Sequence, residues 1–279
     1  MIEKRVLSSI VISAMLGLVI VSLVQAQGAP ERIYNTAKQK LMEGGQVFGG
    51  IVTTSDANIY CAMANAGFDF VWIEMQHSPL TYSDVARMIW SCRGASAVPF
   101  IRVPDVTEGD IQKATDIGAL GIIVPMVDTV EEAEAAVKYS KYPPLGRRSR
   151  GGGQYARLWG DDYRQTANDN IMVVVMIENP AGVEIVDKIA AVPGIDAVVA
   201  ASGDLESFSG YASSDPRYEV MISRIQEETL KAGKILGGPP DWKDRRGFSF
   251  FWSGYDFELI SSGAQRVLGL SPVPHDTLR

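Results

Sequence analysis

Short apolar runs that alternate with helical segments predict that this chain is an α/β protein folded as a (β/α)8 TIM barrel. Eight such runs occur over a length of about 250 residues, which is the number and length expected of that fold. A doubly wound open sheet is the alternative. The barrel is favoured because no Gly-x-Gly-x-x-Gly turn follows the first run at residues 47–52, as a nucleotide-binding open sheet would require.

The first 26 residues have the pattern of a secretory signal peptide. Lys4 and Arg5 form a basic start, residues 10–24 are mostly apolar, and small residues precede a cleavage point after Ala26. A retained membrane anchor is the alternative, but about 15 apolar residues are fewer than the roughly 20 that span a bilayer. We therefore expect an exported protein, periplasmic or extracellular. Its mature chain would be a single domain over residues 27–279, without a stable membrane anchor.

The balance of charges argues against nucleic acid as a partner. The sequence has 26 basic and 33 acidic residues, so its net charge is −7; without Glu3, Lys4 and Arg5 of the signal, 24 and 32 would remain. A negative net charge favours solubility and opposes contact with phosphate backbones.

Cys61 and Cys92 are the two cysteines of the sequence, and both fall on predicted helices. Two buried free thiols are the expected state, because helix cysteines often serve as small core residues. Export would permit a disulfide if the two helices are neighbours. No cysteine or histidine pair has the spacing of a zinc site.

The first half of the barrel is expected to follow an amphipathic helix at residues 29–42, which Gly44 and Gly45 end. Ser55 or Asp56 can cap the next helix, and Thr81 or Ser83 the one after it. In this half we expect strands at residues 47–52, 68–73, 98–103 and 120–125, and helices at 55–67, 81–92, 108–118 and 130–139.

The second half of the barrel is expected to begin with a strand, helix, strand unit over residues 171–204. Val173 opens a β-branched run suited to a strand buried on both faces. Val183, Val186 and Ile189 have helical spacing. In this half we expect strands at residues 173–177, 195–200, 234–237 and 248–252, and helices at 181–190, 218–232 and 256–268.

Between the two halves, the alternation is interrupted by an irregular insertion at residues 141–170. It contains Arg147, Arg148 and Arg150, followed by three glycines at 151–153. Loops this long in a compact domain are usually functional or disordered. Two interpretations stay open: a surface loop with solvated arginines, or a lid whose arginines or glycine amides meet an anionic ligand.

Polar residues gather directly after the predicted strands, where a barrel of this kind carries its chemistry. The first set of these is Glu74, Gln76 and His77 after the second strand, and Arg102 after the third. The second set is Glu178 after the fifth strand, Ser202, Gly203 and Asp204 after the sixth, and Ser253 and Asp256 after the eighth. His77 is a candidate catalytic residue, since the other histidine, His275, lies near the end of the sequence.

These residue types suit one chemistry in particular. Glu178 and Asp204 are oxygen donors with no sulfur nearby, and they would suit Mg²⁺ or Mn²⁺ completed by water. Such an ion leaves positions open for the carboxylate and ketone of a 2-oxo acid, and it stabilises the enolate that forms when a carbon–carbon bond breaks. Arg102 could share that charge or form a structural pair with an acid. His77 could move the proton of a C4 hydroxyl.

Several segments carry a family resemblance. They are GFDFVWIEMQH, FIRVP, TDIGALGIIVPMVDTVEEAEAAV, YPPLGRR with the glycine run, VMIEN, and the GD pair at Asp204. Together they resemble the HpcH/HpaI aldolase and citrate lyase family over residues 46–268, particularly its metal-dependent pyruvate aldolases of the 4-hydroxy-2-oxoheptanedioate aldolase type. The resemblance implies a barrel of the phosphoenolpyruvate/pyruvate type.

The resemblance also implies a role for each site residue. Glu178 and Asp204 would bind the divalent metal, Mg²⁺ or Mn²⁺ with Co²⁺ as a further choice, and Arg102 would stabilise the enolate oxygen of pyruvate. His77 would be the acid/base, oriented by Asp116. Backbone amides around Ser202 and Gly203 would receive the pyruvate carboxylate. The family also implies a homo-oligomer, a hexamer built from dimers that exchange their last helices.

The chain departs from the family pattern in two motifs and in its export. The usual Asp-x-Glu-His reads Glu74-Met75-Gln76-His77, and the usual Gly-Pro-Ala-Asp reads Ala201-Ser202-Gly203-Asp204. The leading hypothesis is a class II aldolase that cleaves a 4-hydroxy-2-oxo acid to pyruvate and an aldehyde. The alternatives are a citrate lyase-type enzyme for a CoA ester, which export disfavours, and an exported oxo-acid-binding protein without turnover, which Gln76 favours.

Overall fold

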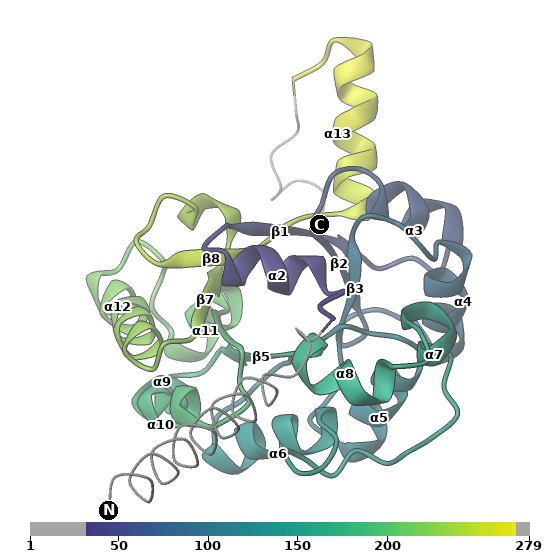
Figure 1. Ribbon diagram of the computed structural model, residues 1–279. Helices are drawn as coiled ribbons and strands as arrows, with labels where there is room; N and C mark the ends of the chain where they lie inside the picture. The colour runs from purple at the N-terminus through teal and green to yellow at the C-terminus, as the bar shows by residue number, and fades with distance from the viewer. Residues whose placement is uncertain (1–31, 272–279) are drawn as a thin grey trace, which may run out of the picture. The chain divides into compact units, whose positions relative to one another are not determined.

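Eight parallel strands close into a barrel in which each strand pairs with the next along the chain and β8 pairs with β1 (Figure 1). The structure is a computed structural model and describes residues 32–271. The predicted (β/α)8 barrel is thus confirmed, whereas the predicted signal peptide and His275 lie outside the described residues. The strands are β1 Val47–Val52, β2 Phe70–Glu74, β3 Val98–Arg102, β4 Gly121–Val124, β5 Met172–Ile177, β6 Ala197–Ala200, β7 Ile235–Gly238 and β8 Phe248–Tyr255.

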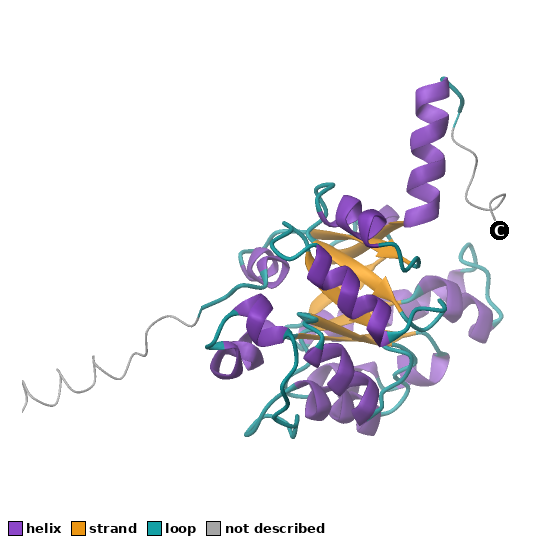
Figure 2. Cartoon of the chain, turned by 90° about the vertical axis from the view of Figure 1, so that its right-hand side faces the viewer, coloured by secondary structure: helices purple, strands orange, loops and turns teal. Residues whose placement is uncertain are grey.

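Most helices surround the strands on the outside of the barrel, whereas α2 lies across one end of it and α13 leads away from it (Figures 1 and 2). They are α2 Thr36–Met42, α3 Ala57–Ala64, α4 Tyr82–Ser91, α5 Glu108–Asp116, α6 Val130–Ser140, α7 Tyr155–Trp159, α8 Tyr163–Asn170, α9 Pro180–Glu184, α10 Val186–Ala191, α11 Ser202–Ser209, α12 Pro216–Lys231 and α13 Asp256–Leu268, with the 3-10 turn η1 Pro240–Trp242. Among the described residues, no helix is long and apolar enough to cross a membrane.

The insertion and the segment after β6 are among the parts that differ from the expected elements. The insertion is not wholly irregular, since its second half forms α7 and α8. Ser202, Gly203 and Asp204 do not lie in a loop but form the first turn of α11. This helix was not predicted because it is short and its first turn holds glycine and serine, which have low helix propensity.

Phenylalanine rings fill the inside of the barrel, and glycines at paired positions of neighbouring strands make room for them. Phe70 stacks on Phe250 with ring centroids 4.6 Å apart and lies 4.8 Å from Phe100. A Cβ placed on Gly49 would come within 2.1 Å of the Phe70 ring, and one on Gly121 within 2.1 Å of the Phe100 ring. A larger residue at either glycine would therefore have to displace a ring from a close-packed core.

Cys61 on α3 and Cys92 at the end of α4 form a disulfide, so the expectation of two buried free thiols is wrong. The Cα atoms of the two residues are 5.4 Å apart, and both side chains are half-buried. The bond joins positions separated by 31 residues. A cross-link over a loop of that length stabilises a folded chain by roughly 3–4 kcal/mol.

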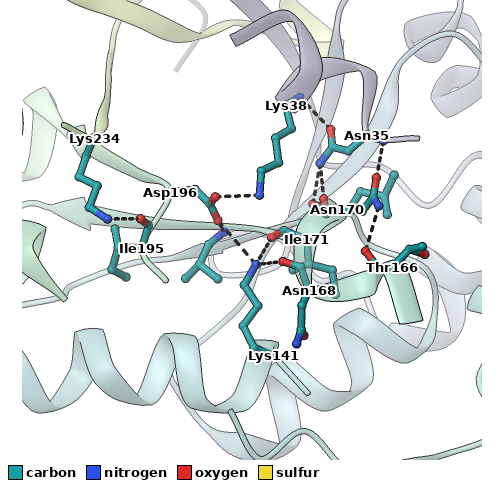
Figure 3. A network of polar contacts seen from close by, with 12 residues as sticks. Asn35, Lys38, Lys141, Thr166, Asn168, Asn170, Ile171, Ile195, Asp196 and Lys234 are labelled. Carbon is teal, nitrogen blue, oxygen red and sulfur yellow. Dashed lines mark hydrogen bonds and ion pairs between the residues drawn. The ribbon is translucent and has the colours of Figure 1, made fainter. Parts of the chain in front are cut away.

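A buried polar network lies where the C-terminal end of α8, the start of β5 and helix α2 meet (Figure 3). Lys141 is 3% exposed and donates to the carbonyls of Asn168 and Ile171, at 2.6 and 2.5 Å. Asp196 lies 3.8 Å from the Lys141 ammonium and 2.9 Å from that of Lys38. The network therefore ties α2 to the end of the barrel opposite the C-terminal ends of the strands.

Burial lowers the pKa of Lys141 to about 8, and the charge of Asp196 opposes this shift. Between pH 8 and about 10.5 the folded protein has released this proton while the unfolded chain keeps it. The free energy of unfolding should therefore rise with pH across this window, by roughly 3 kcal/mol from this group. Urea denaturation at several pH values should show the rise in the wild type but not in Lys141→Met.

Lys234→Met is the matched control, because Lys234 donates to the carbonyl of Ile195 at 2.8 Å in the same region (Figure 3). This variant should keep the pH-dependent rise. An equal rise in Lys141→Met and in the wild type would contradict the assignment.

Candidate active site

A cavity of about 580 Å³ opens at the C-terminal ends of the strands. It brings together seven of the residues singled out in the sequence, namely Glu74, His77, Arg102, Glu178, Ser202, Gly203 and Asp204. The other residues that line it are Ile51, Trp72, Met176, Ala201, Trp252 and Tyr255. The polar residues that follow β2, β3, β5 and β6 therefore form one site, as expected for this fold.

Glu74 is the buried centre of hydrogen bonding on one side of the cavity. It is 1% exposed, and its carboxylate lies 2.5 Å from Nε of Arg102 on the neighbouring strand. The carboxylate also accepts from Nε1 of Trp72 at 3.2 Å and from the amides of Gln76 and His77, at 2.8 and 2.9 Å. One charge thus fixes Arg102 and the turn that carries His77.

Glu178 and Asp204 face one another across the ends of β5 and β6. Burial raises the pKa of Glu178 to about 7; the amide of Met126, which donates to it at 2.6 Å, opposes this shift, whereas a hydrogen bond and the charge of Asp204 add to it. Met126 has a φ of 53°, a left-handed conformation that is uncommon for a residue other than glycine. In this conformation the backbone amide of Met126 points at the carboxylate of Glu178.

The N-terminus of α11 supplies backbone donors to the same cavity. Ala201 is the N-cap and makes no side-chain hydrogen bond to the first turn. Amides at the start of a helix have no partner within the helix and favour anions. Ser202 and Gly203 therefore have the position expected for binding a carboxylate.

His77 lies on the cavity wall, whereas Asp116 lies elsewhere. Asp116 is the last residue of α5, which runs back from β3 toward the N-terminal end of the barrel. There its carboxylate binds Arg148 at 3.0 Å and Gln112 at 2.8 Å. The structure therefore does not bring Asp116 to His77 within one chain, and the orientation of the imidazole by Asp116 stays a prediction.

The insertion is not a lid over the cavity of its own chain, because it connects α6 to the start of β5, at the opposite end of the barrel. Arg148 is buried and surrounded by the rings of Tyr142, Tyr155 and Tyr163, whose hydroxyl accepts from it at 2.8 Å. Arg147 pairs with the exposed Glu108 at 3.1 Å. Arg148 is therefore a structural residue, whereas Arg147 and Arg150 are exposed to solvent, as the surface-loop interpretation expected.

Three aromatic residues of the cavity were missed in the sequence. Trp72 has its indole beside Glu74, and Trp252 and Tyr255 lie on β8. The expected strand ended at residue 252, whereas β8 continues to Tyr255. The available signal was the aromatic content of this segment, which holds Phe248, Phe250, Phe251, Trp252 and Tyr255.

Comparison with known proteins is consistent with this geometry. Residues 51–239 match the sequence profile of HpcH/HpaI aldolase/citrate lyase. The chain belongs to that family. A hydroxypyruvate/pyruvate aldolase of Delftia acidovorans is 33% identical over 237 residues, which cover 80% of this chain and 86% of the relative. A 2-dehydro-3,6-dideoxy-6-sulfogluconate aldolase of Pseudomonas putida is 31% identical over 222 residues, which cover 77% and 85%.

A solved structure supports the family assignment. A family protein of Burkholderia cenocepacia is similar with a TM-score of 0.77 and 26% identity, over 84% of this chain and 98% of that protein. Since the two sequence relatives above are named aldolases, the predicted enzyme class, an aldolase-type lyase, is confirmed.

Glu74→Gln should lower the free energy of unfolding by about 3 kcal/mol, because it leaves Arg102 buried without its carboxylate. An amide also accepts through one oxygen in place of two, so donors around residue 74 would lose partners. Urea or thermal denaturation measures the change. Glu131→Gln, at an exposed acid in the first turn of α6, should shift stability by less than about 0.5 kcal/mol. Equal shifts in both variants would refute the role of Glu74.

Proposed function

We propose that this protein is a divalent-metal-dependent class II aldolase that cleaves a 4-hydroxy-2-oxo acid to pyruvate and an aldehyde. The observation that carries the proposal is one cavity that holds Glu178 and Asp204, Arg102, His77 and the first amides of α11. Two carboxylates, a guanidinium, an imidazole and an amide pair are the groups that this reaction needs.

The two carboxylates fit a divalent cation. Glu178 and Asp204 lie within hydrogen-bonding reach of one another, and two like charges that close together are compensated by a cation between them. Both donors are oxygen atoms, which suits Mg²⁺ or Mn²⁺. Within residues 32–271, no group of three or more acids, histidines or cysteines could hold an ion, so water and substrate would complete the coordination. When bound, the cation would act as a Lewis acid toward the 2-oxo acid.

The residues of the chain would divide the remaining tasks among themselves. The amides of Ser202 and Gly203 bind the carboxylate of the 2-oxo acid. Arg102, held by Glu74, stabilises the negative charge that develops on the enolate oxygen. His77 takes the proton of the C4 hydroxyl as the C3–C4 bond breaks and the aldehyde leaves. The electron pair of that bond forms the enolate, whose C3 then takes up a proton to give pyruvate.

Deuterium exchange into the methyl group of pyruvate, followed by NMR with added Mn²⁺, tests enolate formation directly. Exchange should require the metal. Glu178→Gln removes a ligand of the cation and Arg102→Met removes the guanidinium at the enolate oxygen, so each should slow exchange about 100-fold. Glu131→Gln is the control for loss of an exposed carboxylate and should keep the wild-type rate. His77→Ala should slow cleavage of 4-hydroxy-2-oxopentanoate by roughly 10²-fold.

Two outcomes would decide against this assignment. Tight pyruvate binding without exchange would favour the exported oxo-acid-binding protein. An unchanged cleavage rate in His77→Ala would remove that residue from the reaction.

We also propose that the protein is a homo-oligomer, either a hexamer or another assembly of dimers. Helix α13 leads away from the barrel (Figures 1 and 2), and of its residues only Asp256 is buried. Its apolar side chains are exposed, among them Ile260 at 56% and Val267 at 87%. A helix with so much exposed apolar surface is typical of a subunit interface.

Export to the periplasm or the exterior is the third part of the proposal. The basic and apolar pattern of residues 1–26 supports it, and so does the disulfide between Cys61 and Cys92. Disulfides persist in oxidising compartments and are rare where thiols are kept reduced.

One preparation tests both the export and the assembly. Protein recovered from the periplasm or medium should have the mass of a chain that begins at Gln27. Sedimentation should give a multiple of that chain mass. Ile260→Glu on α13 should dissociate it, because burying an unpaired charge at an interface is costly. Val220→Glu is the matched control at an exposed apolar residue of α12 and should leave the assembly intact. A monomeric wild type or an uncleaved chain would contradict the corresponding part.

A further inference from the structure

The cavity at the C-terminal ends of the strands has two chemically different sides. Glu178 and Asp204 lie on the side formed by β5, β6 and α11. The other side, formed by β1, β2 and β8, presents the rings of Trp72, Trp252 and Tyr255. The carboxylates, Arg102 and the α11 amides account for the pyruvate portion of a substrate. The aromatic side is not needed to bind the pyruvate portion.

The rings on the aromatic side form a wall that a ligand can reach. Trp252 is inclined to Trp72, with centroids 5.9 Å apart and planes at 59°, and Tyr255 stacks on Phe257 at 5.3 Å. Trp252 and Tyr255 are half-buried, so part of each ring faces the cavity. Covering such apolar surface with a ligand is favourable at about 25 cal/mol per Å². A flat apolar group also gains from stacking on the rings.

A second hollow of about 360 Å³ continues from this wall. It shares His77 and Tyr255 with the main cavity and is bordered further out by Pro79 and Phe257. His77 thus stands between the site of the reacting carbonyl and the second hollow. The part of the aldehyde beyond its carbonyl would therefore extend past His77 along Tyr255.

Charges around this path disfavour an anionic group. Arg102 is the single arginine among the described residues that line the two hollows, and none of those residues is a lysine. Arg102 is already paired with Glu74. The outer hollow contains the acid Glu258. A carboxylate or phosphate on the aldehyde would meet aromatic faces and an acid, and it would lose its hydration without gaining a cation.

We infer that the aldehyde partner carries an uncharged aromatic or apolar group, and that Trp252 and Tyr255 select it. The inference rests on the proposed aldolase function and specifies the substrate class of that site. In the synthetic direction, C3 of the pyruvate enolate gives its electron pair to the aldehyde carbon and the C3–C4 bond forms. The π pair of the aldehyde moves to its oxygen, which takes the proton from His77. Cleavage is the reverse of this step.

The test compares benzaldehyde with succinic semialdehyde, an aldehyde that carries a carboxylate, on the full mature protein. Binding to the protein with Mn²⁺ and pyruvate is measured by calorimetry, and the rate of addition to pyruvate is measured in parallel. Benzaldehyde should bind at least tenfold more tightly and show the higher kcat/KM. Tighter binding of succinic semialdehyde would overturn the inference.

Substitutions on the wall separate selection from general damage. Trp252→Ala should lower the ratio of kcat/KM for benzaldehyde to that for acetaldehyde about tenfold, and Tyr255→Ala should lower it in the same direction. A merely structural effect would lower both values together. Trp90→Ala removes a half-buried tryptophan of α4 outside both hollows and should keep the ratio. Trp252→Arg should move the preference toward succinic semialdehyde, because it adds the missing cation.

Failure of this inference can be told from failure of the aldolase proposal. Absent deuterium exchange into pyruvate would contradict the aldolase, while the calorimetric preference between the two aldehydes still decides the inference. Exchange together with equal binding of the two aldehydes would contradict the inference alone.

Discussion

The buried ion pair between Glu74 and Arg102 is the interaction on which the rest of the site depends. It lies between paired positions of β2 and β3, so the register of the barrel alone brings the two side chains together. The same carboxylate fixes the backbone at Gln76 and His77 and the indole of Trp72. Because every acceptor position of Glu74 is used, the arginine and the histidine turn are held in place before any substrate arrives.

An excess of negative charge is the second constraint on the cavity. Three acids line it, and the guanidinium of Arg102 is bonded to one of them. Burial and the neighbouring Asp204 raise the pKa of Glu178, because a protonated carboxyl avoids repulsion between two like charges. The amides at the start of α11 add positive potential on the same side. This electrostatic arrangement favours a cation together with an anionic substrate group.

The sequence was sufficient for the barrel and for most of the site. Strand patterns and caps are local signals, and strands β1 and β3 were predicted within one residue of their observed ends. His77, Arg102, Glu178 and Asp204 were found because a barrel places strand ends at one rim. Helix α11 was missed because it is short and begins with residues of low helix propensity. The disulfide and the position of Asp116 depend on packing between distant segments, which a local pattern does not contain. The aromatic wall was missed because β8 extends beyond the apolar run that marked it.

The filled interior of the barrel limits where this enzyme can change its specificity. Phe70, Phe100 and Phe250 occupy the volume that Gly49 and Gly121 leave free, so none of these five positions can vary in size independently of the others. The total volume of these five residues below the active site is therefore fixed by their packing. New substrates can be accommodated only at the rim, where Trp252 and Tyr255 border open space. The positions at which substitutions can change specificity are thus separate from the positions that maintain the shape of the barrel.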